Sequence, residues 1–285
     1  MRLHYFYITM KILFCMYLIP QIKKNEYEKY GFTIIPNLIP DYEIEVIYNA
    51  IFDLFKKYNP VGANKCVGQK PWLSQEFHDG LKQLQDDQPK LFSKLYDSLQ
   101  TNSKILGIGL MDEILTTASE LLKKPNQHLM PCDLSSSVTL FRMDAPQKNI
   151  HTLGWHQEQV SYNQNDDGSN GLVVWAPLQK VDPKLGTLYV CIGSHKTGFI
   201  EPTLTGSYGQ LANEKKFVDD ETTKEYEQDG VVMNAGDVLF VNMLTLHRSG
   251  DMSNANRFRF TLTARLHNAF SNDFNPGRLR FIPSN

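Results

Sequence analysis

Trp155-His156-Gln157-Glu158 is the stretch around which the rest of the chain is organised. Side chains in an extended strand alternate between its two faces, so a histidine and a carboxylate two residues apart point to the same side. The sequence therefore predicts two ligands of a facial metal site at His156 and Glu158, with a third ligand from a distant segment. Alone, a His-x-Glu triplet is a weak signal, because such triplets arise by chance and strand histidines are usually structural.

The candidate third ligand is His247, which follows a predicted strand at residues 237–242. Two imidazoles and one carboxylate on a β scaffold are the facial triad of non-haem Fe(II) oxygenases, and they leave the opposite coordination positions free. Zinc could occupy the same ligands, although no residue is obviously placed as its general base. Three hypotheses follow: an iron oxygenase, a non-catalytic cupin-like protein that binds a metal or ligand, and a zinc hydrolase.

The segment after His247 favours the iron oxygenase. Arg257 and Arg259 alternate with two phenylalanines on a predicted strand. An arginine facing a barrel interior is a costly buried charge unless an anion meets it. A dicarboxylate co-substrate that binds the metal at one end would bring its other carboxylate there, in the bidentate geometry that arginine favours. The alternative is that one arginine faces solvent and the other pairs with an acidic neighbour. Both arginines have the same strand parity, so the pattern alone does not choose.

The second half of the chain has a residue pattern typical of a β-barrel. Short β-rich runs alternate with turn residues and predict strands at residues 138–142, 172–175, 187–190, 238–241 and 258–266. This spacing favours a mainly β fold, a double-stranded β-helix of the jelly-roll or cupin-like type. Upstream, residues 30–35 predict a strand, and apolar periodicity predicts helices over residues 41–55, 91–99 and 103–123, the first capped by Asp41. We expect these helices to pack on one sheet.

We expect one dioxygenase domain over residues 26–270, with an N-terminal extension at 1–25 and a C-terminal tail at 271–285. Residues 203–229 are polar and net acidic, and we predict an excursion from the barrel, either a lid or a solvated loop. Residues 5–19 are mostly apolar, but Lys11 interrupts them and the run is short for a membrane span. We therefore expect either a start-site extension or a segment packed on the domain, rather than a membrane anchor or a secretion signal.

The composition limits the classes of binding partner that the sequence favours. The 285 residues carry a formal net charge of −2, so no global basic field attracts nucleic acid or an anionic membrane. The four cysteines are scattered without a C-x-x-C pair, which is typical of a reduced, cytoplasmic protein. A small-molecule substrate is the expected partner, and the sequence carries no signal for an oligomeric state.

Several further motifs follow the opening stretch along the chain. They are Val174-Trp175-Ala176-Pro177-Leu178, Gly193-Ser194-His195, Ala235-Gly236-Asp237, His247-Arg248-Ser249-Gly250 and Arg257-Phe258-Arg259-Phe260. Together, and in this order, they resemble the phytanoyl-CoA dioxygenase family of Fe(II)/2-oxoglutarate oxygenases, and the similarity covers most of residues 26–267.

The resemblance implies a role for each matching residue. His156, Glu158 and His247 match the iron ligands, and Arg259, in preference to Arg257, matches the arginine that holds the distal carboxylate of 2-oxoglutarate. Fe(II), 2-oxoglutarate and O2 would then serve to hydroxylate, or otherwise oxidise, an unactivated C–H bond of a small organic substrate, with release of succinate and CO2. Trp175 and Ser249 fall where the family lines its co-substrate pocket, and His195 either borders the site or stabilises a turn.

The chain departs from the family at three positions. Its carboxylate is Glu158 where aspartate is usual, the gap from His247 to Arg259 is about one residue longer, and Ile192 replaces a proline. Related halogenases lack the carboxylate and bind chloride in its place, so Glu158 argues for hydroxylation-type chemistry. No pantetheine- or phosphate-binding cluster indicates an acyl-CoA substrate.

Overall fold

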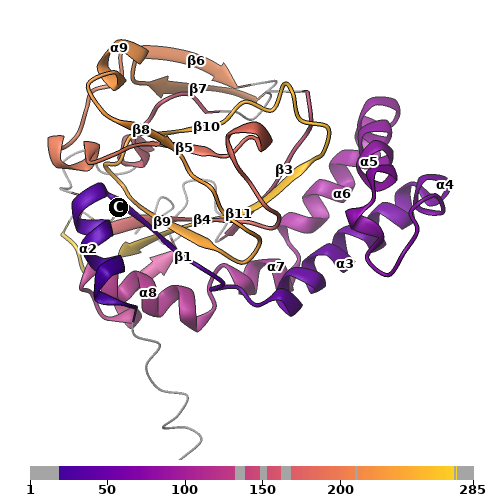
Figure 1. The fold of residues 1–285 in the computed structure, drawn as a ribbon, viewed down its shortest axis with the longest axis horizontal. Helices are drawn as coiled ribbons and strands as arrows, with labels where there is room; N and C mark the ends of the chain where they lie inside the picture. The colour runs from indigo at the N-terminus through magenta and orange to yellow at the C-terminus, as the bar shows by residue number, and fades with distance from the viewer. Residues whose placement is uncertain are drawn as a thin grey trace, which may run out of the picture.

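Two facing antiparallel sheets and a layer of helices make up the computed structural model, which describes residues 19–131, 139–147, 153–161, 168–208, 211–272 and 274 (Figure 1). Residues 1–18, and with them most of the apolar N-terminal stretch, lie outside the described residues, as does most of the predicted tail. Within the described ranges, no helix combines the length and the apolar character needed to cross a membrane.

The large sheet has the order β1-β9-β4-β11-β2, and β3 also pairs with β11. The small sheet has the order β10-β5-β8, and an isolated antiparallel bridge between His156 and His247 extends it. The predicted jelly-roll architecture is confirmed. The strands are β1 (Phe32–Ile35), β2 (Leu129–Pro131), β3 (Thr139–Asp144), β4 (Gly171–Pro177), β5 (Leu188–Cys191), β8 (Gln228–Gly230), β9 (Val238–Asn242), β10 (His247–Ser249) and β11 (Arg259–Asn268).

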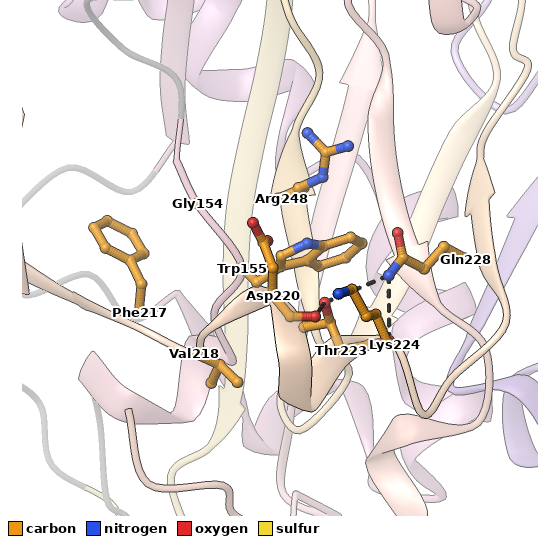
Figure 2. Close-up of a pocket in the computed structure, with 9 residues that line it drawn as sticks. All are labelled: Gly154, Trp155, Phe217, Val218, Asp220, Thr223, Lys224, Gln228 and Arg248. Carbon is orange, nitrogen blue, oxygen red and sulfur yellow. Dashed lines mark hydrogen bonds between the residues drawn. The ribbon is translucent and has the colours of Figure 1, made fainter. Parts of the chain in front are cut away.

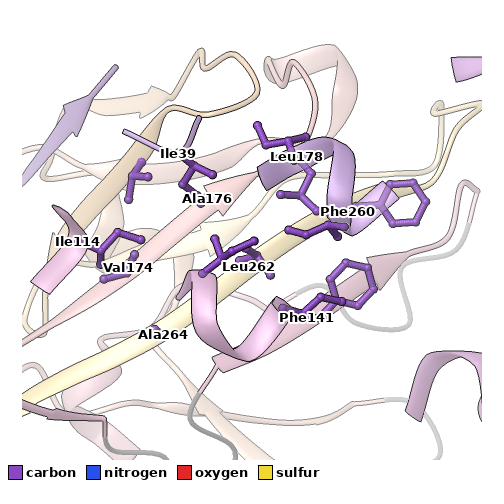
Figure 3. Close-up of a cluster of buried hydrophobic side chains, with 14 of the residues drawn as sticks. Ile39, Ile114, Phe141, Val174, Ala176, Leu178, Phe260, Leu262 and Ala264 are labelled. Atoms are coloured by element: carbon purple, nitrogen blue, oxygen red, sulfur yellow. The ribbon is translucent and has the colours of Figure 1, made fainter. Parts of the chain in front are cut away.

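Strand β11 separates the hydrophobic core on one of its faces from the inside of the barrel on the other. Phe260, Leu262 and Ala264 point toward the helices and belong to the main core cluster (Figure 3). Their neighbours on the other face, Arg259 and Arg265 among them, line a cavity between the two sheets. Because alternate side chains of a strand point to opposite faces, one strand supplies both the apolar core and the charged interior.

The helices between residues 41 and 122 cover the face of the large sheet that points away from the small sheet, as predicted (Figure 1). The core between helices and sheet contains fully buried aromatic rings such as Phe55, Phe77 and Phe260. The helices are α2 (Gln21–Tyr30), α3 (Asp41–Tyr58), α4 (Pro60–Ala63), α5 (Gln75–Asp87), α6 (Pro89–Gln100), α7 (Ser103–Ile108), α8 (Asp112–Leu122) and α9 (Asp220–Thr223), with short 3-10 turns η1 (Pro71–Leu73), η2 (Asn126–His128), η3 (Glu158–Ser161), η4 (Pro183–Leu185) and η5 (Ser194–Thr197).

Three details of the predicted helices were wrong. The helix expected over residues 103–123 is divided into α7 and α8, and glycines, which are poor helix formers, stand at 107 and 109 beside the break. Asp41 does not cap α3. Pro40 holds the N-cap position, and Asp41 begins the helix, where its charge faces the positive end of the helix dipole. The amphipathic helix α5 was not predicted.

The predicted excursion at residues 203–229 is partly built into the barrel. It forms a hairpin of β6 (Leu204–Tyr208) and β7 (Leu211–Phe217), then α9, and ends in β8, which pairs with β5. The expectation of a free excursion was therefore wrong at its C-terminal end. The backbone N–H of Val218 donates to the carbonyl oxygen of Trp155 at 2.8 Å and ties this segment to the residue before His156.

Candidate metal centre

His156, Glu158 and His247 meet inside the barrel, and all three are buried. One ligand atom from each lies within 4.8 Å of the others. Oε2 of Glu158 is 4.0 Å from Nε2 of His156 and 3.8 Å from Nε2 of His247. The structure thus brings together the three residues that the sequence predicted, from the bridge segment, the first turn of η3 and the first residue of β10.

Glu158 reaches the site by a different path from the one predicted. His156 forms a strand bridge, but Glu158 begins the 3-10 turn η3, so strand alternation does not place the carboxylate. The amide side chain of Gln157 explains the turn: its Nε2 donates to the carbonyl oxygens of Gly198 and Leu244, at 2.8 and 2.7 Å. These bonds hold the chain at residue 157 against the segments that contain Gly198 and Leu244.

The hydrogen bonds of both histidines fix which ring nitrogen faces the site. Nδ1 of His156 lies 2.8 Å from the carbonyl oxygen of Gly154, and Nδ1 of His247 lies 2.9 Å from that of Thr245. A carbonyl oxygen can only accept, so each Nδ1 carries the proton and each Nε2 keeps its lone pair. Such outer hydrogen bonds orient metal-binding histidines.

The charge states of the triad also suit a cation. Burial, and then the neighbouring imidazole of His247, lower the pKa of His156 to about 3. Burial likewise lowers the pKa of His247. Burial alone would raise the pKa of Glu158, but Arg265 and the two histidines outweigh it and hold that pKa at about 2. At neutral pH the site therefore offers two neutral imidazoles and one carboxylate.

The donor set fits a divalent ion in type and nearly in distance. Ligands bound at right angles about 2.1 Å from an ion lie roughly 3 Å apart. The carboxylate oxygen and the imidazole nitrogens are 3.8 and 4.0 Å apart, so binding would draw them together by about 1 Å. Two nitrogens and one oxygen on one side of the cavity match the facial triad of non-haem iron sites.

Arg265 on β11 was not predicted as a site residue. Its Nε donates to Oε1 of Glu158 at 2.9 Å, and its side chain is largely buried in the same cavity. The strand pattern held a signal for it, because Arg265 has the same parity as Arg259. The pattern did not indicate that Glu158 is the partner of Arg265, because Glu158 lies in the turn η3 and not on a strand beside β11.

Arg259 lies in the metal cavity, and Arg257 does not. Strand β11 begins at Arg259, whose guanidinium is buried and donates to Oδ2 of Asp144 from two nitrogens, at 3.1 and 2.7 Å. Arg142 binds the other oxygen of that carboxylate at 3.2 Å. Arg257 precedes the strand, is exposed and donates to Gln75. Sequence reasoning missed Asp144 and Arg142, because the strand predicted over residues 138–142 ended two residues before Asp144, whereas β3 continues to it.

The remaining predicted residues divide between the cavity and the scaffold. Trp175 and Ser249 both line the metal cavity, and the hydroxyl of Ser249 also accepts a hydrogen bond from the backbone of Leu153. His195 lies in η5, where its Nε2 is 3.2 Å from the carbonyl oxygen of Glu28, and it does not line this cavity. Its place supports the turn-stabilising alternative.

Comparisons with known proteins agree with this geometry. The sequence model of the family "Phytanoyl-CoA dioxygenase (PhyH)" matches residues 27–260. The structure is similar to EvdO2 from Micromonospora carbonacea var. aurantiaca complexed with 2-oxoglutarate, with a TM-score of 0.55 and 14% identity over 90% of this chain and 93% of that one. It is also similar to the non-heme monooxygenase ThoJ, with a TM-score of 0.53 and 18% identity over 86% and 76% of the two chains. A search of curated proteins finds no match.

The jelly-roll fold and the two-histidine, one-carboxylate triad define a 2-oxoglutarate-dependent non-haem iron oxygenase. Within that class, the chain belongs to the phytanoyl-CoA dioxygenase family, whose model matches most of its length.

Proposed function

We propose that this chain hydroxylates an unactivated C–H bond of a small organic molecule. In the balanced reaction, the substrate C–H, 2-oxoglutarate and O2 give the alcohol, succinate and CO2. The observation that carries the proposal is one cavity that is lined by His156, Glu158, His247 and Arg259 together. One end of a dicarboxylate would bind the metal at the triad, and its other carboxylate would then reach Arg259.

Each residue has a distinct part in this proposal. His156, Glu158 and His247 hold Fe(II), which when bound supplies the dioxygen and redox chemistry that no side chain provides. Arg259 binds the distal carboxylate of 2-oxoglutarate, and Trp175 and Ser249 border the co-substrate. The apolar side chains that share the cavity wall keep water away from the reacting groups: these are Leu153, Val173, Leu188 and Val241.

The charges around the cavity support a dianionic co-substrate. Around the cavity, the described part of the chain places guanidinium groups of Arg142 and Arg259 on Asp144 and that of Arg265 on Glu158. A divalent ion at the triad would add positive charge, and buried charges need compensation. 2-Oxoglutarate brings two negative charges that would compensate it.

An anaerobic titration tests the proposal. Adding 2-oxoglutarate to the full chain loaded with Fe(II) should produce a weak visible absorption band, and Glu158→Ala should lose it. Admitting air should then release succinate slowly, even without the prime substrate. Absence of a band, combined with a Glu158→Ala variant that behaves like the wild type, would refute the proposal.

The two alternatives receive less support from the site. A zinc hydrolase needs a general base, but the ionisable residues that line the described cavity besides the triad are arginines. A cupin-like protein without turnover would release no succinate under any condition. Restoring activity to metal-free protein with iron or with zinc separates these cases, and succinate release across a metabolite library would identify the substrate.

A further inference from the structure

A second cavity, of about 640 Å³, lies behind the strands that carry the histidine ligands (Figure 2). Trp155 precedes His156, and Arg248 follows His247, so strand alternation points both side chains away from the metal centre. Short segments before and around α9 form the opposite wall. The lining residues are Gly154, Trp155, Phe217, Val218, Asp220, Thr223, Lys224, Gln228 and Arg248.

Arg248 is the unusual residue of this cavity. Of the five arginines in the described residues, the other four each have a polar partner, whereas the contacts of Arg248 are with aromatic rings. Its guanidinium carbon lies 5.1 Å from the ring centre of Trp155 and 4.4 Å from that of Tyr189, and its Nε is buried without a hydrogen-bond partner. Figure 2 shows the guanidinium above the Trp155 ring.

The two rings hold the guanidinium in place without neutralising it. A cation next to aromatic rings gains cation–π stabilisation, but its N–H donors still need acceptors. The planar group has donors along its edge that match a carboxylate or a phosphate. Arg248 is thus a positioned cation with no carboxylate of its own within the described part of the chain.

The remainder of the cavity favours an anion with an apolar body. Lys224 is already paired with Glu221 at 2.5 Å, and Asp220, exposed at the rim, is the opposing carboxylate. Phe217 and Val218 are buried and give the cavity an apolar wall beside Trp155. A hydrophilic ion alone would leave this wall unused.

We propose that this cavity binds an organic acid, with its carboxylate or phosphate on the edge of Arg248 and its apolar body against Phe217 and Val218. The site goes beyond the proposed oxygenase function, because it lies outside the metal cavity and needs neither iron nor 2-oxoglutarate. A bound acid would nevertheless be close to the metal centre, since the ring of Phe217 packs edge-on against that of His156, with 6.5 Å between centres.

Calorimetric titration of the full chain without iron tests the proposal with three probes: phenylacetate, phenyl phosphate and the neutral phenylacetamide. At least one acid should bind saturably, and the amide at least tenfold more weakly. Stronger binding of phenyl phosphate would indicate a phosphate ligand, and stronger binding of phenylacetate a carboxylate ligand. Arg248→Gln should weaken the acid at least tenfold. Arg257→Gln, which removes an exposed arginine, and Arg259→Gln, which removes one in the metal cavity, should not.

A measurement on the wild type covers the case in which Arg248→Gln fails to fold. Phenylglyoxal modifies accessible arginines, and peptide mass spectrometry reports the extent at each position. The bound acid should protect Arg248 and leave Arg257 reactive. The proposal is overturned if neither acid binds, if the amide binds equally well, if Arg259→Gln weakens the acid and Arg248→Gln does not, or if Arg248 is not protected.

Discussion

Arg265 binds one oxygen of the Glu158 carboxylate and leaves the other facing the two histidines. Nε of Arg265 donates to Oε1 at 2.9 Å, while Oε2 faces the Nε2 atoms of both histidines at 3.8 and 4.0 Å. With one oxygen occupied, Glu158 has a single oxygen left for an ion. The longer side chain of glutamate, compared with the aspartate usual in this family, is thereby anchored at one oxygen while the other faces the histidines.

Replacing Arg265 should weaken metal binding. Arg265→Met removes the donor and frees Oε1, and loss of an outer hydrogen bond to a ligand typically costs about 10- to 100-fold in metal affinity. Arg265→Lys keeps the charge and should lose less. Calorimetric titration with Mn²⁺ measures both variants. The charge alone acts in the other direction, because a cation beside the site repels a divalent ion. Tighter binding in Arg265→Met would therefore contradict the positioning role.

A double-mutant cycle with Glu158→Asp tests whether Arg265 acts through Glu158. The shorter aspartate cannot reach both Arg265 and the ion, so Glu158→Asp should lower Mn²⁺ affinity in the wild type. In the Arg265→Met background this second loss should shrink, with a coupling of about 0.5–3 kcal/mol. Strictly additive losses would show instead that Arg265 only supports the fold.

Arg259 should bind 2-oxoglutarate, and Arg257 should not. Arg259→Gln removes a charged hydrogen-bond donor from the metal cavity, and such bonds contribute about 1.5–3 kcal/mol, so the Kd for 2-oxoglutarate should rise roughly 10- to 100-fold. Arg257→Gln removes the same charge outside the cavity and is the matched control. Titration of the visible band under argon gives both constants. An effect confined to Arg257→Gln would reverse the assignment.

The sequence predicted those parts of the site whose position follows from a local residue pattern, such as strand alternation or a short motif. The alternation along residues 258–266 predicted β11, and the ordered motifs predicted His156, Glu158 and His247. The path of Glu158 was missed because Gln157 is held by Gly198 and Leu244, which are 41 and 87 residues away. The same holds for Asp144, whose partner Arg259 is 115 residues distant. Such contacts depend on how the strands assemble, which no local window contains.

Phe260 should affect stability without affecting the metal site. It lies between the site residues of β11 but points into the aromatic core, 5.6 Å from the ring of Tyr48 and 6.3 Å from that of Phe77. Phe260→Ala should lower the free energy of unfolding by about 3–5 kcal/mol. Urea denaturation measures this loss. Mn²⁺ affinity, measured on the folded variant at low temperature, should match the wild type, and a large loss of affinity at unchanged stability would contradict this division of the strand.

His78 should make the fold less stable in acid. Burial, and then the charge of Arg257, lower its pKa to about 4, and its Nδ1 accepts a hydrogen bond from the backbone of Phe258. The unfolded chain, with a histidine pKa near 6.5, binds more protons between pH 4 and 6.5, so stability rises with pH across that window. The contribution is complete above about pH 6.5, where it reaches roughly 3 kcal/mol, and is lost as pH falls toward 4. Asn can accept the same hydrogen bond without titrating. Urea unfolding of wild type and His78→Asn at several pH values should therefore give curves that converge as pH falls, whereas parallel curves would show that His78 titrates normally in the fold.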